Sequence, residues 1–316
     1  IPKMNEYAKD YESAVDFVNM CESKHGHMLA ELGKEIMNNI DSIRLIGIAG
    51  PSSSGKTTFS HRLRIELMAL GLKPVMISID DYYLGREMAP KNADGTPDLE
   101  HIDALDVELF NKDMFNLIQG QAVTLPIFNF KTGKREEHTT PMKLEKNQIL
   151  LLDSLHGLYE PMTSSVSNEQ KFKLYIETLC QIRGADSNFI RWTDIRLLRR
   201  MVRDSWHRSY NPRQTLEHWH YVRRSEIQHI IPFLGTVDHI IDGSLPYELP
   251  IYKKHLFKFF PDFVKDYKDN PKRQDAYIRA KRVFDLLDSV KEWSDEEVIP
   301  KDALIREYIG GSIYKY

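Results

Sequence analysis

The stretch Gly50-Pro51-Ser52-Ser53-Ser54-Gly55-Lys56-Thr57 decides the fold of this chain. It matches the pattern G-x-x-x-x-G-K-[ST], and it follows an apolar run over residues 43–49 that only Arg44 interrupts. The residues after it predict a helix that begins at Thr57, because apolar side chains recur at Phe59, Leu63, Leu67 and Leu70. A buried strand, a glycine-rich turn and a helix in this order are the setting of a phosphate-binding P-loop.

This loop predicts a site for a nucleoside triphosphate, with ATP as the expected nucleotide. Glycines let backbone N–H groups point at phosphate oxygens, and the start of the helix adds its partial positive charge. We expect Lys56 to reach the β- and γ-phosphates and the Thr57 hydroxyl to ligate Mg²⁺. The expected ATP-binding residues of this segment are Gly50, Pro51, Ser52, Ser53, Ser54, Gly55, Lys56, Thr57 and Thr58.

Composition narrows the class of protein. The 316 residues, with 41% hydrophobic content, are enough for one or two domains with a sizeable core. The net charge of −3 provides no general positive field, so we expect no nucleic-acid partner. The two cysteines, Cys21 and Cys180, suit a reducing compartment and exclude a disulfide framework. With no apolar stretch as long as a membrane span, we expect a cytoplasmic protein without a membrane partner; a homo-oligomer is compatible with the sequence.

The pattern along the chain predicts an α/β fold in three parts. Residues 1–40 predict an N-terminal helical extension, residues 41–254 a P-loop domain, and residues 255–316 a C-terminal helical appendage. Short β-branched runs alternate with helical patterns in the middle part, which predicts a parallel sheet covered on both faces. The expected strands are residues 43–49, 75–79, 149–153, 172–176 and 237–241.

Two local features interrupt this pattern. Residues 123–144 predict an inserted β-hairpin that turns at Thr132-Gly133 and covers a substrate. In the N-terminal extension, His25 and His27 flank Gly26, which is typical of a solvated turn rather than a metal site.

Carboxylates follow two of the expected strands, where an α/β sheet places its chemistry. Asp80 and Asp81 end the strand at 75–79, and Asp153 ends the strand at 149–152. An apolar run that ends in Asp is typical of a residue that holds Mg²⁺, and a strand-end Asp80 can accept the proton of an acceptor hydroxyl. The neighbouring Tyr82 and Tyr83 offer an aromatic wall for the acceptor.

Missing motifs separate a kinase from a hydrolase. The sequence contains neither N-K-x-D nor D-x-x-G, which a GTPase would carry. Ser154 follows Asp153, where a motor-type ATPase usually has a Glu that activates water. A small-molecule kinase is therefore favoured.

An arginine-rich segment predicts a lid over residues 196–215. Arg196, Arg199, Arg200 and Arg203 share one face of a helix, and Arg208 and Arg213 follow it. In an enzyme that transfers phosphoryl groups, such a cluster screens transition-state charge, whereas a solvated basic face is the alternative. We expect Arg200 and Arg203 to be catalytic, Arg208 to contact ATP, and Arg196 to contact the acceptor. For the pair Arg223-Arg224 the sequence allows two interpretations, a contact with the nucleotide or simple packing.

Together these segments resemble the uridine kinase / phosphoribulokinase family of P-loop kinases, from about Ile43 to Lys254. They are G-P-S-S-S-G-K-T at 50–57, S-I-D-D-Y-Y at 78–83, L-E-H-I-D-A-L-D at 99–106, P-I-F-N-F at 126–130, the strand ending at Asp153, and R-L-L-R-R-M-V-R-D at 196–204. The stretches D-S-L-H-G-L and W-H-Y-V-R-R-S-E resemble a bacterial-type subgroup, in which a region similar to threonyl-tRNA synthetase often precedes the kinase.

The resemblance implies a parallel five-stranded sheet with helices on both faces, and it implies roles for individual residues. Asp80 would be the catalytic base, Lys56 the phosphate clamp, and Thr57 with Asp153 the Mg²⁺ ligands. Glu100 would hold ribose hydroxyls, and Tyr83 and Phe128 would line the nucleoside site.

Three positions depart from the family pattern. Asp153-Ser154 stands where the family usually has Glu-Gly, Phe128 replaces a Tyr, and Gly133 stands where nucleoside-selective relatives have a His. We expect ATP- and Mg²⁺-dependent phosphoryl transfer to a small hydroxyl acceptor, a nucleoside in first place. A non-nucleoside sugar or polyol acceptor is one alternative, and a nucleotide-binding regulatory module with weak catalysis is the other.

Overall fold

A computed structural model gives the structure of residues 1–93, 95–99, 101–129, 132–145, 147–184, 186–207, 210–293 and 295–315, with the backbone alone at 137–139 and 207. The strands are β1 Leu45–Ala49, β2 Lys73–Ser78, β3 Ala122–Asn129, β4 Lys134–Lys143, β5 Gln148–Ser154, β6 Lys171–Glu177 and β7 His239–Asp242. The helices are α1 Pro2–Tyr7, α2 Tyr11–Asn38, α3 Lys56–Ala69, α4 Val107–Ile118, α5 Trp192–His207, α6 Pro212–His229, α7 Glu248–Leu256, α8 Phe260–Tyr267, α9 Gln274–Asp288 and α10 Arg306–Ile309. No described helix is both long and apolar enough to cross a membrane.

A five-stranded sheet in the order β2-β5-β1-β6-β7 forms the centre of the molecule. Every neighbouring pair in it is parallel, with Leu45 of β1 opposite Leu150 of β5 and opposite Lys171 of β6. The α/β fold with a parallel five-stranded sheet is therefore confirmed. The five expected strands are present with their ends shifted by a few residues.

Alternate residues of the central strands enter two hydrophobic clusters on opposite faces of the sheet. Ile46 and Leu151 belong to the cluster that includes α2, α3, α5 and α7, whereas Leu45 and Leu150 belong to the one that includes α4 and the β3–β4 hairpin. This two-sided burial explains why the strands read as nearly continuous apolar runs rather than alternating ones.

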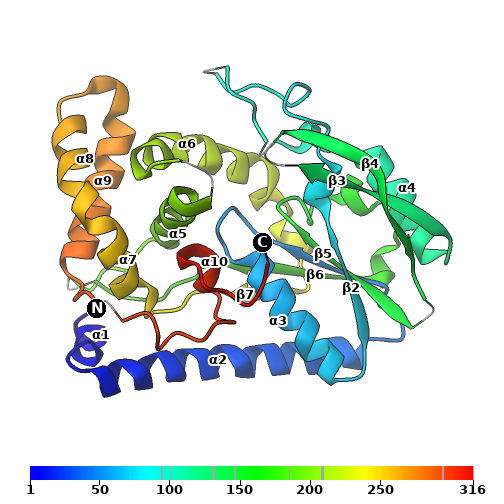
Figure 1. Cartoon of the computed structure of the whole chain (residues 1–316), viewed down its shortest axis with the longest axis horizontal. Helices are drawn as coiled ribbons and strands as arrows, with labels where there is room; N and C mark the ends of the chain where they lie inside the picture. Colours follow the sequence, from blue (N-terminus) through cyan, green and yellow to red (C-terminus); the bar gives the residue numbers. More distant parts are fainter. Residues whose placement is uncertain are drawn as a thin grey trace.

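The antiparallel pair β3–β4 is the expected hairpin, and it packs beside α4 at one end of the molecule (Figure 1). Helices α8 and α9 lie at the other end, and the long helix α2 runs along the lower edge of the view and contacts α3. Residues of α2 and α9 share one hydrophobic cluster with the sheet, and α7 runs across position 254. The boundaries at 40 and 254 stay predictions.

The interpretation of His25 and His27 as part of a solvated turn is wrong. Both lie inside α2, and the His25 side chain is only 4% exposed. Neither His25 ring nitrogen has a hydrogen-bond partner among the described residues. Burial, with smaller effects of Arg62 and Arg199, lowers the pKa of His25 to about 3. Gly26 weakens a helix only modestly, and the apolar face of α2 outweighs this cost.

Candidate active site

The P-loop connects the end of β1 to the start of α3. Gly55 has a φ of +97°, a left-handed conformation that suits glycine, and Ser53 is left-handed as well at +62°. A side chain at Gly50 would collide with the carbonyl oxygen of Ile176 on the adjacent strand β6. Gly55 is therefore required by the left-handed turn, and Gly50 is required by the close approach of the two backbones.

Polar groups of the loop are available to a phosphate. The hydroxyls of Ser53 and Ser54 are buried and have no hydrogen-bond partner among the described residues. The Lys56 ammonium donates to the carbonyl of Pro51 at 3.3 Å, so this side chain lies along the loop. Unsatisfied hydroxyls, an ammonium and a helix N-terminus in one turn fit a bound phosphate chain.

Two carboxylates predicted from the sequence lie close to this loop. Asp153 stands near the end of β5, and Asp80 lies in a short 3-10 turn directly after β2. Burial raises the pKa of Asp153 to about 6; Lys56 lowers it, Asp80 raises it, and a hydrogen bond from Thr57 lowers it. Because Lys56, Thr57 and Asp80 all act on the Asp153 carboxylate, the structure brings together residues that the sequence predicted at three different segments.

The Thr57 hydroxyl and the Asp153 carboxylate form a pair of oxygen donors. They are joined by a hydrogen bond, and oxygen is the ligand type that Mg²⁺ prefers. The described residues contain no cluster of three or more His, Cys, Asp or Glu side chains that could enclose a metal by themselves. The pair therefore fits an ion that completes its coordination with phosphate oxygens and water, as Mg²⁺ commonly does.

Arg196 on helix α5 differs from our expectation. Its side chain is fully buried and contacts Glu177 at 2.8 Å, Glu226 through two nitrogens, and the carbonyl of Ser52 at 3.0 Å. The guanidinium is thus engaged by two carboxylates and by the P-loop backbone, which places it as a support of the loop rather than as an acceptor contact.

Arg199, one helical turn later, supports the same loop, a role that we did not predict. It donates to the Ser54 carbonyl at 2.8 Å and to the Gly243 carbonyl at 2.7 Å, and it forms a two-point contact with Glu248 at 2.5 and 2.6 Å. The helical face seen in the sequence exists, but its first half lies inside the protein. The acidic partners, Glu177, Glu226 and Glu248, belong to other elements, so the sequence around the arginines does not indicate them.

The second half of the arginine face reaches the surface of the loop. Arg200 donates to the Ser52 hydroxyl at 2.9 Å and, like Arg203, contacts the carboxylate of Asp204. Arg200 thus lies against the loop, whereas the contacts of Arg203 are with Asp204, and transition-state charge screening by either arginine stays a prediction. Arg208 lies outside the described residues.

The predicted acceptor residues form a buried aromatic contact beside Asp80. The rings of Tyr83 and Phe128 lie 5.3 Å apart, and the side chains are 6% and 4% exposed. The Tyr83 hydroxyl donates to the Leu99 carbonyl at 2.9 Å, and the Phe128 N–H donates to Asp81 at 3.0 Å. Both side chains are thus largely covered by the protein, and their contact with an acceptor stays a prediction. Glu100 lies outside the described residues.

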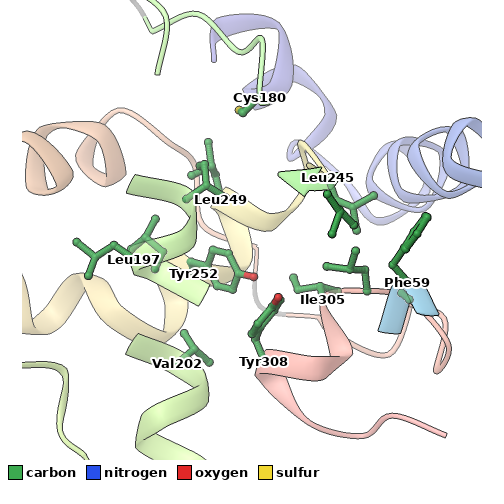
Figure 2. Close-up of a cluster of buried hydrophobic side chains, with 14 of the residues drawn as sticks. Phe59, Cys180, Leu197, Val202, Leu245, Leu249, Tyr252, Ile305 and Tyr308 are labelled. Carbon is green, nitrogen blue, oxygen red and sulfur yellow. The ribbon is translucent and has the colours of Figure 1, made fainter. Parts of the chain in front are cut away.

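A residue far along the chain, missed by sequence reasoning, contacts the start of α3. The Glu307 carboxylate accepts hydrogen bonds from the Thr58 N–H at 3.1 Å and from the Thr58 hydroxyl at 2.9 Å. Leu304 packs so closely on Gly55 that a Cβ there would lie 2.6 Å away. Figure 2 shows Ile305 and Tyr308 of the same segment among the buried side chains around Phe59. We call residues 303–309 the C-terminal segment.

Comparison of the sequence with known proteins places the chain in a family. A sequence profile of the phosphoribulokinase / uridine kinase family matches residues 45–247. The chain belongs to this family. The match ends before α7 is reached, so the C-terminal segment lies outside it.

Uridine kinases are among the relatives of this family member. The uridine kinase of Mycoplasma genitalium is 29% identical over 175 residues, which cover 55% of the chain and 73% of that protein. The uridine kinase of Borrelia duttonii is 27% identical over 230 residues, covering 71% and 97%. A solved D-glycerate 3-kinase from Cryptococcus neoformans var. grubii covers 82% of the chain and 87% of that chain, at 12% identity and a TM-score of 0.33. Family membership identifies the chain as a nucleotide-binding, small-molecule kinase.

Proposed function

We propose that this kinase transfers the γ-phosphoryl group of ATP to a hydroxyl of a nucleoside, with Mg²⁺ as the metal. The observation that carries the proposal is the meeting of Lys56, Thr57, Asp80 and Asp153 at the carboxyl ends of β1, β2 and β5. An ammonium, two oxygen donors and a second carboxylate are the groups that phosphoryl transfer to an alcohol needs.

Each residue has one task in this reaction. Asp80 orients the acceptor hydroxyl and takes its proton as the oxygen attacks the γ-phosphorus, while the bond from phosphorus to the β–γ bridging oxygen breaks. Lys56 and the loop N–H groups hold the β- and γ-phosphates, and Arg200 and Arg203 approach the transferred group from α5. Bound at Thr57 and Asp153, Mg²⁺ would supply positive charge to the phosphate oxygens.

The nucleoside assignment rests on the uridine kinase relatives, and the aromatic pair Tyr83 and Phe128 beside Asp80 is compatible with it. Gly133 cannot supply a side chain to the base, and a Cβ there would lie 2.6 Å from Arg86. We therefore expect the ribose hydroxyls to dominate recognition. Uridine and cytidine should differ little in kcat/KM, and 2′-deoxyuridine should lose about ten- to a hundredfold.

Acceptor-dependent release of ADP from ATP tests the proposal. The panel contains uridine, cytidine, 2′-deoxyuridine, glycerate and fructose, and the Lys56→Ala variant serves as the inactive control. Uridine or cytidine should give the largest kcat/KM. Turnover with only glycerate or fructose would replace the nucleoside by a sugar or polyol acceptor. ATP binding without turnover for any acceptor would contradict a kinase.

A further inference from the structure

A cavity of about 500 Å³ lies between the start of α5 and helices α6 and α9, whose relative positions are seen in Figure 1. No P-loop residue lines it. Five arginines from three parts of the chain line it instead, namely Arg191, Arg223, Arg224, Arg279 and Arg282. So many guanidinium groups around one cavity repel each other unless anions lie between them.

Carboxylates of the protein neutralise only some of these five arginines. Arg282 contacts Asp194 at 2.6 and 2.7 Å, and Arg279 contacts Asp275 at 2.6 Å. These two arginines are therefore neutralised within the protein, and the Asp194 carboxylate is almost fully buried.

The other three guanidinium groups are less well matched. Arg223 contacts Glu226, but this carboxylate also binds the buried Arg196. Within the described part of the chain, no carboxylate lies within 4.0 Å of Arg191 or Arg224, and both side chains are exposed. The cavity thus has a local excess of positive charge, although the whole chain carries −3.

Size and apolar surface of the cavity fit a small organic ligand. Small-molecule sites typically occupy about 300–1,000 Å³ and combine apolar walls with a few polar groups. Here Ile227, which is 57% exposed, provides apolar surface between the arginines. Guanidinium groups bind phosphate through two parallel N–H donors, which adds geometric specificity to the charge attraction.

We propose that this cavity is a second ligand site of the kinase, separate from the P-loop, that binds a small phosphorylated molecule. Arg191 and Arg224 are the anchors for the phosphate group, because the protein leaves them without a carboxylate. Ile227 faces the organic part of the ligand. A phosphorylated nucleoside and a phosphorylated sugar share the chemistry that this site recognises.

Isothermal titration of pyrophosphate, UMP and fructose 1,6-bisphosphate tests the site. The test variant is Arg191→Gln with Arg224→Gln, which removes two charges without stranding a carboxylate. The matched control is Lys34→Gln with Arg64→Gln on α2 and α3, which removes the same charge elsewhere. We expect at least one phosphorylated probe to bind about ten- to a hundredfold more weakly to the test variant and unchanged to the control. Binding of UMP alone identifies a nucleotide ligand, and binding of the bisphosphate alone identifies a sugar phosphate.

The P-loop also attracts anions, so the titrations are repeated in the Lys56→Ala background, where the arginine-dependent component should persist. Equal affinities in the test variant and the control would overturn the proposal, and so would the absence of binding at about 1 mM probe. Arginine-dependent binding of single-stranded RNA without any small probe would also overturn it in favour of a nucleic-acid surface. None of these readouts involves phosphoryl transfer, so the result is independent of the proposed kinase activity.

Discussion

Asp80 and Asp81 are adjacent carboxylates with different surroundings. Asp80 lies near enough to Asp153 to raise the pKa of that residue. Asp81 instead accepts the N–H of Phe128, and burial raises its pKa. The first carboxylate therefore faces the phosphate site, whereas the second fixes the hairpin strand β3 to the turn after β2. Because the two carboxylates differ in surroundings but not in chemistry, a substitution of Asp81 can serve as the control for the same substitution of Asp80.

Replacing Asp80 by Asn should lower kcat by about 10²–10⁴, because the amide keeps the shape of the side chain but cannot accept a proton. ATP affinity, measured by equilibrium binding, should hardly change. Asp81→Asn is the matched control, since its amide oxygen can still accept the Phe128 N–H, and it should keep kcat near that of the parent. Equal losses in the two variants would refute the assignment of Asp80 as the base.

For individual residues, the sequence predicts a role correctly where that role depends on neighbours in the sequence. Lys56 and Thr57 were found because the loop and the first turn of the helix are contiguous. Arg196 was misplaced because its partners, Glu177 and Glu226, belong to other elements. The spacing of residues in a helix predicts which side chains share a face. Whether that face is buried depends on the elements that pack against it.

Helix α5 combines structural and functional arginines in one element. Arg196→Met should destabilise the protein by about 3–5 kcal/mol in urea unfolding, because it leaves buried carboxylates without their partner. Arg200→Ala should instead lower kcat by about 10²–10³ with a much smaller loss of stability. The Arg64→Met variant controls for removal of a partly exposed arginine. A loss of kcat in Arg200→Ala that follows its loss of stability would remove Arg200 from the chemistry.

Helix α10 places a carboxylate where a phosphate is expected to bind. The Thr58 N–H donates to Glu307, and N–H groups at this position of a P-loop are the ones that cradle phosphates. Glu307→Gln keeps an acceptor for Thr58 but removes the negative charge. The Kd for ATP should therefore decrease by about two- to fivefold. Glu297→Gln, an exposed substitution nearby in sequence, should leave the Kd unchanged. Weaker ATP binding in Glu307→Gln would show that the carboxylate supports the nucleotide.

Over the whole molecule, the N-terminal extension is tied to the central sheet through α2, and His25 lies in that contact. A pKa of about 3 in the folded state, against about 6.5 in an unfolded chain, means that the unfolded state binds the extra proton. Stability is therefore fully present above pH 6.5 and falls by up to about 1.4 kcal/mol per pH unit as the pH drops towards 3.

The pH dependence of urea unfolding measures this effect. Between pH 6.5 and 4.5, His25→Leu should lose less stability than the parent protein. His27→Leu, which changes an exposed side chain of the same helix, should keep the parent slope. Identical slopes in all three proteins would show that His25 is not the group that titrates.

Much of the molecule could be predicted from local patterns, because the central strands carry apolar runs and the P-loop carries its own motif. The two hydrophobic clusters follow from alternation within those strands. The position of residues 303–309 could not be predicted, since their contacts with the loop join residues 249 positions apart. A contact between residues so far apart in the sequence depends on the completed sheet, and no local sequence pattern indicates it.

That separation also sets an order of events during synthesis. Glu307 is the 249th residue to be added to the growing chain after Thr58. At about 5–20 residues per second, roughly 12–50 seconds pass in between. Throughout that interval the first turn of α3 has neither its distant carboxylate nor the Leu304 side chain against Gly55. The phosphate-binding turn therefore gains its contacts in stages, because strands β5, β6 and β7 of the sheet are made first and Leu304 and Glu307 are made after them.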